Sequence, residues 1–314
     1  MQVTIIIPVY NRAHVLRRTL DSIVAQTYRP LQLVLVDNAS TDHSWQLITR
    51  FAAEAPEGID TVALQEPRAG ACAARNTGFA AATGHWVLFF DSDDTMAPRH
   101  IERIVSAVSA APAEPDMVNW GRQLVDTAGH SVVKPARPAD AIANHLLHST
   151  FATQAWAARR DFLAAAPLWD ETLPAWNDYE FGLRLLLRDP RVVTLTGDTT
   201  VTVYSSGEAS ITGTGFASRA GYWEQVLDLL GAHIAASGRS DCRRLLRLLD
   251  FRRLTLAAQY RREGRSDLAA PLRRRALDAL GYSAINRLTM PLLYRHIAAG
   301  RRGAAPLARL LIRQ

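Results

Sequence analysis

Cysteine is scarce in this chain of 314 residues, and long apolar runs are missing. The only cysteines, Cys72 and Cys242, lie far apart and have neither metal-ligand nor redox-motif spacing, which favours a reducing compartment. No stretch approaches about 18 consecutive apolar residues, so the sequence predicts no transmembrane helix. The N-terminus has neither a basic segment nor a small-residue cleavage site, so we expect no signal peptide. Together these absences predict a cytoplasmic protein.

Lysine is nearly absent as well. Lys134 is the only lysine, and the other basic side chains that are charged at neutral pH are arginines. The net charge of +6 is distributed unevenly along the chain. Residues 239–314 contain 18 arginines and five acidic residues, a net charge of +13, which leaves −7 for residues 1–238. The sequence therefore predicts an acidic N-terminal part and a basic C-terminal part.

Short apolar runs alternate with helical patterns over the first 120 residues. Strands are predicted at Val3–Val9, Leu31–Val36, Thr61–Leu64 and Trp86–Phe90, and amphipathic helices near 14–26, 42–54 and 71–82. The runs are continuous rather than alternating, which is typical of strands covered on both faces. Asp42 is the expected N-cap of the second helix. We predict an α/β fold with a single mostly parallel, doubly wound (Rossmann-like) sheet, a small antiparallel extension and a C-terminal α-helical region.

The pattern changes after about Pro112. It predicts a strand at Asp116–Trp120, a hairpin over Gly121–Lys134, a helix at Tyr179–Leu187, strands at Val192–Leu195 and Thr200–Tyr204, and helices at Ala220–Ala236, Cys242–Arg262 and Asp267–Leu280. We therefore expect a catalytic or ligand-binding domain over residues 1–212 and a basic helical region over 213–314.

Polar residues follow three of the predicted strands directly. They are Pro8-Val9-Tyr10-Asn11-Arg12, Asp37-Asn38-Ala39-Ser40-Thr41-Asp42 and Asp91-Ser92-Asp93-Asp94. Ligands of open parallel sheets bind outside the carboxyl ends of the strands, so we expect these segments to meet at one edge. Three carboxylates at the end of a buried strand repel one another unless a cation neutralises them, and oxygen ligands suit Mg²⁺ or Mn²⁺. The alternative is that these acids only cap the next helix.

The order and spacing of several motifs resemble those of family 2 glycosyltransferases, which have the A-type glycosyltransferase fold. The motifs are Thr4–Arg12, Val36–Asp42, Ala74-Arg75-Asn76-Thr77-Gly78, Asp91–Asp94, and Trp169–Leu173 followed by Asn177–Glu180. The resemblance covers about residues 2–212 and implies an inverting transferase that uses a nucleotide diphospho-sugar, a UDP-sugar in our prediction, and a divalent cation.

The resemblance also implies roles for individual residues. Pro8, Tyr10 and Asn11 would border the nucleotide, and Asp37 would accept a hydrogen bond from the base. Asp91, with Ser92, would contact ribose or the donor sugar, and Asp93 would hold the metal. Arg68 and Arg75 are candidates for the diphosphate environment, since arginine offsets phosphate charge. A structural arginine on the predicted helix 71–82 is an equal alternative for Arg75.

Asp178 is the candidate general base that takes the proton of the acceptor hydroxyl. The family usually has Glu-Asp here, whereas this chain has Asn177-Asp178. The alternative is that the pair only caps the following helix. Trp176 and Tyr179 are expected to form an apolar wall that raises the pKa of Asp178 or contacts the acceptor, and Glu180 is a reserve candidate for either role.

A second departure occurs at Tyr204-Ser205-Ser206-Gly207-Glu208-Ala209-Ser210, where many relatives have a basic residue or histidine after the tyrosine. Ser206 and Ser210 are candidates for phosphate contacts, although a solvated loop is favoured. These departures leave open a sugar- or partner-binding module that has kept the fold. A sugar-nucleotide nucleotidyltransferase is less favoured, because no glycine-rich loop follows the first strand.

Arginines and leucines interleave through the C-terminal region, including Ile285–Ile312. A basic amphipathic segment of this kind suits peripheral contact with an anionic membrane, which would fit a lipid-linked glycan acceptor. The equal alternative is that the leucines pack internally while the arginines are solvated. Other expected acceptors are a glycan or a small molecule, in surface-glycan or natural-product synthesis. Nucleic-acid binding is not expected.

Overall fold

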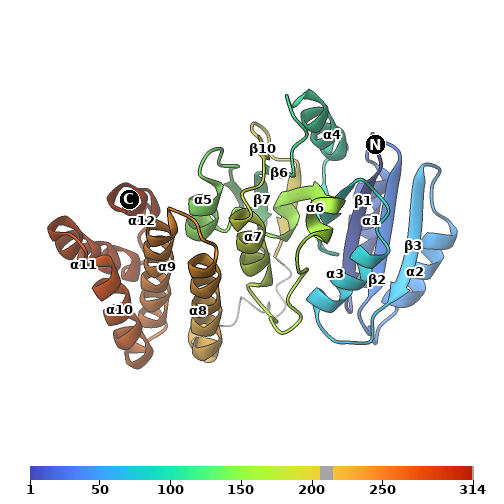
Figure 1. The fold of residues 1–314 in the computed structure, drawn as a ribbon. Coiled ribbons are helices and arrows are strands. Elements are labelled where there is room, and N and C mark those ends of the chain that lie inside the picture. Colours follow the sequence, from blue (N-terminus) through green and yellow to red (C-terminus); the bar gives the residue numbers. More distant parts are fainter. Residues whose placement is uncertain (206–214, 313–314) are drawn as a thin grey trace. The chain divides into compact units, whose positions relative to one another are not determined.

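The computed structural model describes residues 1–205 and 215–312, which form two compact units (Figure 1). The first unit contains Met1–Ala139, Thr150–Leu185 and residues 189–205, and the second contains Asp140–Ser149, Leu186–Arg188 and residues 215–312. The predicted domain boundary at 212/213 lies outside the described residues. A feature that the sequence did not predict is that the short segment 140–149 groups with the C-terminal helices.

A seven-stranded sheet forms the centre of the first unit, with the order β10-β6-β9-β4-β1-β2-β3 among the described residues. Its strands are β1 (Val3–Val9), β2 (Leu31–Asp37), β3 (Ile59–Gln65), β4 (Trp86–Phe89), β6 (Met117–Trp120), β9 (Trp156–Arg159) and β10 (Val192–Leu195). Strand β9 is antiparallel to both of its neighbours, while the other adjacent strands pair in parallel. The predicted mostly parallel α/β sheet is therefore confirmed.

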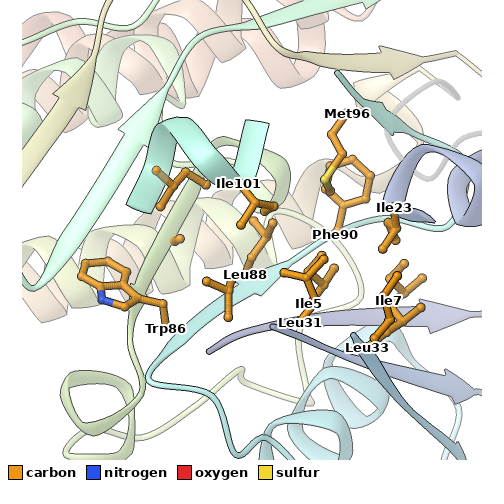
Figure 2. Packing of buried hydrophobic residues seen from close by; sticks show 14 of the residues in the cluster. Ile5, Ile7, Ile23, Leu31, Leu33, Trp86, Leu88, Phe90, Met96 and Ile101 are labelled. Carbon is orange, nitrogen blue, oxygen red and sulfur yellow. The ribbon is translucent and has the colours of Figure 1, made fainter. Parts of the chain in front are cut away.

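Both faces of the sheet are covered by apolar side chains, and Figure 2 shows the cluster on one of them. Ile5 and Ile7 of β1 belong to a core cluster with residues of α1 (Leu16–Val24), α2 (Ser44–Ala53) and α4 (His100–Ala110). The opposite face is covered by α3 (Ala71–Ala80), where a Cβ on Gly78 would lie 2.4 Å from Ile6 Cγ2. Because β1 is buried on both faces, its sequence is apolar at consecutive positions rather than at alternate ones.

An aromatic cluster extends this second face toward the later part of the chain. The ring of Phe89 on β4 lies 5.2 Å from that of Trp169 and 5.8 Å from that of Trp156, measured between centroids. Phe181 of α7 (Asn177–Leu187) completes the cluster, 4.5 Å from Trp169. The cluster therefore places the start of α7 close to the end of β4, where the acidic segment follows.

A second sheet of four strands has the order β5-β11-β7-β8. Its strands are β5 (Thr95–Met96), β7 (Arg122–Val125), β8 (Ser131–Lys134) and β11 (Val201–Tyr204). The pair β7–β8 is the predicted hairpin, whereas β11 pairs with β7 in parallel. The small extension is therefore a separate sheet, and it brings Tyr204 back to the segment that follows β4.

The second unit is helical in its described residues. Its helices are α5 (Ala141–His148), α8 (Ala220–Ala236), α9 (Cys242–Arg262), α10 (Ser266–Leu280), α11 (Ala284–Ala298) and α12 (Ala304–Leu311). Helix α9 is central, because α5, α8, α10, α11 and α12 all contact it. Asp140, at the start of α5, forms ion pairs with Arg244 and Arg309. The predicted helical region is confirmed for α8, α9 and α10.

Some local expectations were incomplete. The position that precedes α2 is His43, and Asp42 instead accepts hydrogen bonds from Ser44 N at 2.9 Å and Ala13 N at 3.0 Å. The sequence did not predict β9, α5, the turn of 3₁₀ helix at Thr153–Ala155, or the helix α6 (Arg160–Ala164). In the described part of the chain, no helix is both long and apolar enough to cross a membrane.

Candidate active site

The segments after β1 and β2 meet as expected, and Asn11 joins them. Asn11 N donates to Ser40 Oγ at 3.0 Å, and Asn11 Oδ1 accepts from Thr41 N at 2.8 Å. Asn11 has a φ of 51°, a left-handed conformation that asparagine tolerates better than most residues. Pro8 is buried in β1, and Tyr10 is 57% exposed. The structure thus gives Asn11 a role in shaping the loops and leaves the Tyr10 side chain accessible.

Asp37, the last residue of β2, has an unused hydrogen-bond acceptor. Its side chain is only 1% exposed, and its Oδ2 accepts from Ser40 N at 3.3 Å. Its Oδ1 is buried without a hydrogen-bond partner among the described residues. A buried carboxylate oxygen without a donor is costly, so this atom is suited to a ligand N–H or O–H.

The acidic segment after β4 concentrates negative charge in a partly dry environment. Asp94 is 1% exposed, and its Oδ1 accepts from Tyr204 N at 3.0 Å. Burial, together with the charges of Asp91 and Asp93, raises the pKa of Asp94 well above its ordinary value. Burial also raises the pKa of Asp93, with a further contribution from Asp91. Ser92 is buried, and its carbonyl accepts from Thr19 Oγ1 at 2.9 Å.

The three carboxylates differ in how far other protein groups stabilise their charge. Asp91 accepts from Arg75, and Gln154 Nε2 donates to both Asp91 and Asp94. Within residues 1–205 and 215–312, no side chain donates a hydrogen bond to the Asp93 carboxylate. Arg12 Nε lies 3.6 Å from Asp93 Oδ2. Asp93 is therefore the carboxylate most open to an added cation.

The described residues contain no group of three His, Cys, Asp or Glu side chains arranged to hold a metal ion by themselves. Mg²⁺ in nucleotide enzymes is commonly bound by one or two carboxylates together with phosphate oxygens and water. Asp93, with its raised pKa and little hydrogen bonding, meets that requirement. The residues present therefore fit a divalent cation that is completed by a diphosphate.

Gln154 is a site residue that sequence reasoning missed. It lies in the 3₁₀ turn Thr153–Ala155 and is 7% exposed, and its carbonyl accepts from Trp120 Nε1 at 2.8 Å. Its amide donates to Asp91 and Asp94, so it stabilises two carboxylates without adding a positive charge. A single glutamine outside any motif or periodic segment gives no sequence signal for this role.

Arg75 connects the acidic segment to the start of α7. It is 5% exposed and donates from Nη2 to Asp91 Oδ1 at 2.9 Å and from Nη1 to Asn177 Oδ1 at 3.4 Å. Its guanidinium carbon lies 4.5 Å from the centre of the Trp169 ring. Its Nε is buried and lacks a partner among the described residues. The structure thus gives Arg75 a bridging position, and a direct diphosphate contact stays a prediction.

Arg68 is engaged with acidic side chains rather than isolated. Its guanidinium pairs with Glu66 at 2.7 Å and with Glu171 at 2.7 Å, while 60% of its side chain is exposed. The hydrogen bonds from Arg68 and Thr77 lower the pKa of Glu66 to about 2. These contacts tie the segment after β3 to the segment that precedes α7. A donor contact from Arg68 stays a prediction.

Asp178 lies in the first turn of α7, beside the acidic segment. Burial raises its pKa, while the positive charges of Arg75 and Arg122 oppose that rise. Arg122, on β7, is the second residue that sequence reasoning missed, since it was assigned only to a hairpin. The expected rise in the pKa of Asp178 is therefore found. The carboxylate also accepts from Tyr179 N at 2.8 Å.

The three candidate acceptor residues differ in exposure. Trp176 is partly buried, and its ring packs 5.8 Å from that of Tyr179, centre to centre. Tyr179 is 2% exposed and Glu180 is 1% exposed. Glu180 forms an ion pair with Arg184 inside α7. Tyr179 and Glu180 therefore hold the helix in place in this structure, and their burial gives no support to an acceptor contact.

The altered loop after β11 is only partly described. Ser205 N donates to Val125 O at 2.9 Å, which continues the pairing of β11 with β7. Ser206 and Ser210 lie outside the described residues, so neither their candidate phosphate contacts nor the favoured solvated loop is tested.

The candidate site lies at the carboxyl ends of parallel strands in an α/β fold, and solved structures of transferases share this fold. TarS residues 1–349 from S. aureus, in complex with UDP-GlcNAc, superpose with a TM-score of 0.73 at 18% identity, over 99% of this chain and 90% of that chain. The mannosyltransferase PcManGT from Pyrobaculum calidifontis, with GDP-Man and Mn²⁺, gives a TM-score of 0.52 at 22% identity, over 99% and 88%.

The sequence itself is similar, over part of its length, to proteins described as glycosyltransferases. An uncharacterized glycosyltransferase from Nostoc sp. is 41% identical over 105 residues, 33% of this chain and 32% of that protein. Glycosyltransferase GlyA from Streptococcus pneumoniae is 35% identical over 119 residues, 38% of this chain and 17% of that protein. The matches thus span about a third or less of these relatives. Residues 4–139 match the family model described as glycosyl transferase family 2.

Proposed function

We propose that the chain is an inverting glycosyltransferase, which moves a sugar from a nucleotide diphospho-sugar to an acceptor hydroxyl. One observation carries the proposal: Arg75 bridges Asp91 of the acidic segment and Asn177, the neighbour of Asp178. A carboxylate cluster suited to a metal–diphosphate and a carboxylate of raised pKa are thereby held side by side. The match of residues 4–139 to the glycosyl transferase family 2 model and the shared fold support the same reaction class.

The donor is proposed to bind along the ends of β1, β2 and β4. The free Oδ1 of Asp37 would accept from the base, and the exposed Tyr10 would border it. Asp91 would contact ribose or the donor sugar, and Asp93 would hold Mn²⁺ or Mg²⁺. A bound divalent cation would neutralise charge on the departing diphosphate. A UDP-sugar is the proposed donor, supported by the fold shared with the TarS complex that contains UDP-GlcNAc.

Asp178 is proposed as the general base. Its carboxylate takes the proton of the acceptor hydroxyl as that oxygen forms a bond to the anomeric carbon of the sugar. The bond between that carbon and the diphosphate oxygen breaks at the same time, and the electron pair leaves with the nucleoside diphosphate. Attack opposite the leaving group inverts the configuration. The proposed acceptor is a glycan, a lipid-linked glycan or a small molecule in surface-glycan or natural-product synthesis.

A binding module with the same fold is the second candidate, favoured by one observation. Asn177 stands where the family usually has an acid, and its Oδ1 is used by Arg75. A binding module would keep the donor contacts of Asp37 but would not need a base at Asp178. The two candidates therefore differ in turnover rather than in donor affinity.

The test measures nucleoside diphosphate release from a panel of nucleotide sugars, with Mn²⁺ or with EDTA. We expect release from one donor, dependent on metal, and reduced at least about 100-fold in Asp93→Ala and in Asp178→Ala. Asp60→Ala, on the exposed end of β3, is the matched control and should retain full activity. Donor binding measured by calorimetry without turnover would select the binding module, and failure to bind any donor would refute both candidates.

A further inference from the structure

Helix α11 is apolar on two opposite sides, and only one side is covered. Met290 and Tyr294 are buried in the helical unit. On the other side, Ile285, Leu288 and Leu292 are 63%, 73% and 59% exposed. Their spacing of three and four residues places them in one stripe along the helix. A solvated helix normally carries polar residues on this side, so the stripe needs an explanation.

Helix α12 also has exposed apolar side chains. Leu307 and Leu310 are each 52% exposed, whereas Ala308 is fully buried. Helix α12 contacts α11, and Tyr282 Oη, just before α11, donates to Leu311 O at 2.9 Å. We call the exposed residues Ile285, Leu288, Leu292, Leu307 and Leu310 the α11–α12 face. They are half of the large hydrophobic residues recorded as exposed in the described chain, so the exposure is concentrated rather than scattered.

The charge around this face has a single sign. Residues 279–314 contain six arginines and no aspartate or glutamate. Arg295, Arg301 and Arg302 are exposed, and none forms an ion pair with any residue that the structure describes. Arg275 of α10 and Arg309 of α12, by contrast, pair with Asp228 and Asp140 at 2.7 and 3.2 Å. The segment that carries the α11–α12 face therefore has at least three exposed arginines whose charge no described acidic residue compensates.

We propose that the α11–α12 face docks on an anionic membrane surface. The leucine and isoleucine side chains would enter the boundary between headgroups and acyl chains, and the flanking arginines would bind the lipid phosphates. A second copy of the chain fits this surface poorly, because self-association through it would bring uncompensated arginines together. The docking does not depend on the proposed transferase activity. It would place the enzyme where a lipid-linked acceptor is found.

The test is co-sedimentation of the full chain with vesicles of phosphatidylcholine, with and without phosphatidylglycerol. We expect binding to the anionic vesicles, weakened by high salt, and at least about tenfold weaker binding to neutral vesicles. The variant Ile285→Gln/Leu288→Gln/Leu292→Gln should lose at least about tenfold in affinity for anionic vesicles. Because all three side chains are exposed, circular dichroism and the melting temperature should be unchanged.

Two matched controls test whether vesicle binding depends on the α11–α12 face or on any exposed apolar or basic side chain. Val132 and Val133 lie on β8, outside this face, and are 45% and 54% exposed. The variant Val132→Gln/Val133→Gln should therefore bind vesicles as the wild type does. Arg295→Gln/Arg301→Gln should weaken binding, whereas Arg261→Gln/Arg262→Gln at the end of α9 should weaken it less. Equal vesicle binding by the wild type and the α11 variant would overturn the proposal. Absence of binding, with dimers that the α11 variant abolishes, would instead assign the face to a second copy.

Discussion

Replacing Arg75 with methionine would remove the charge that joins the acidic segment to the start of α7, while the apolar stem would remain. The hydrogen bond from Arg75 to Asp91 is charge-assisted, and such bonds contribute about 1.5–3 kcal/mol. Asp91 is 31% exposed, so the lower end of that range applies. The contact with the Trp169 ring, at 4.5 Å from a largely desolvated guanidinium, adds about 1–2 kcal/mol. We therefore expect a loss of about 3 kcal/mol.

The assay is urea unfolding of Arg75→Met at neutral pH, with Arg68→Met as the matched control. Arg68 also forms ion pairs, but 60% of its side chain is exposed to solvent that screens them, so its loss should destabilise the fold clearly less than the loss of Arg75. A loss for Arg75→Met below about 1 kcal/mol, or one no larger than that of Arg68→Met, would refute the reasoning from burial.

The same variant should change the pH dependence of activity. The charge of Arg75 opposes the effect of burial on Asp178, so its removal raises the pKa of Asp178 further. The acidic limb of the activity profile should therefore move to higher pH in Arg75→Met and stay in place in Arg68→Met. An unchanged limb in both variants would show that Arg75 does not act on the base.

Two further predictions follow from burial and close packing. The pKa of Asp178 is higher in the folded protein than in the unfolded chain. At a pH above the folded-state pKa, the ionised carboxylate therefore destabilises the folded protein. At a pH below the unfolded-state pKa, Asp178 is protonated in both states and this destabilisation disappears. Asp178→Asn should thus lose at least about 100-fold in activity. Its free energy of unfolding at pH 7 should be no lower than that of the wild type, and any gain in stability should disappear at acidic pH. A marked loss of stability at pH 7 would contradict this prediction. Gly78→Ala should cost about 1–3 kcal/mol in urea unfolding, because its Cβ would lie 2.4 Å from Ile6 Cγ2. Gly221→Ala in α8 should cost nothing, because an added Cβ there would meet no atom within 4 Å apart from its chain neighbours and the backbone of its own helix. Equal losses in the two variants would refute the packing argument.

The fold was largely predictable where local pattern and burial coincide. Strands β1 and β10 and helices α8 and α9 have the predicted bounds. Their apolar residues follow the period of the element or, in β1, fill consecutive positions. Helix α5 was missed because Asn144 and His145 are buried within it, at 1% and 0% exposure, so its inner face does not appear apolar in the sequence.

The site was predictable where its residues follow strands directly. The segments that carry Asp37 and Asp91 could be placed at one edge of the sheet from topology alone. Gln154 and Arg122 could not, because they reach the site from a 3₁₀ turn and from the second sheet. Their positions depend on how these segments pack against the end of β4, and neither a sequence motif nor a hydrophobic periodicity predicts this packing.

These two missed residues bear on why the acidic segment can accept a cation. Gln154 satisfies oxygens of Asp91 and Asp94 with a neutral amide, so it keeps both carboxylates ordered without cancelling their charge. Arg122 acts on Asp178 and Asp94 and is not among the charges that lower the pKa of Asp93. Arg12 and Arg18 both lower the pKa of Asp93, but neither donates a hydrogen bond to its carboxylate. Arg12 Nε lies 3.6 Å from Asp93 Oδ2, beyond hydrogen-bond range, and Arg18 donates to the backbone carbonyl of Asp93. Negative charge remains where the proposed metal–diphosphate would bind, and positive charge limits the rise in the pKa of the proposed base.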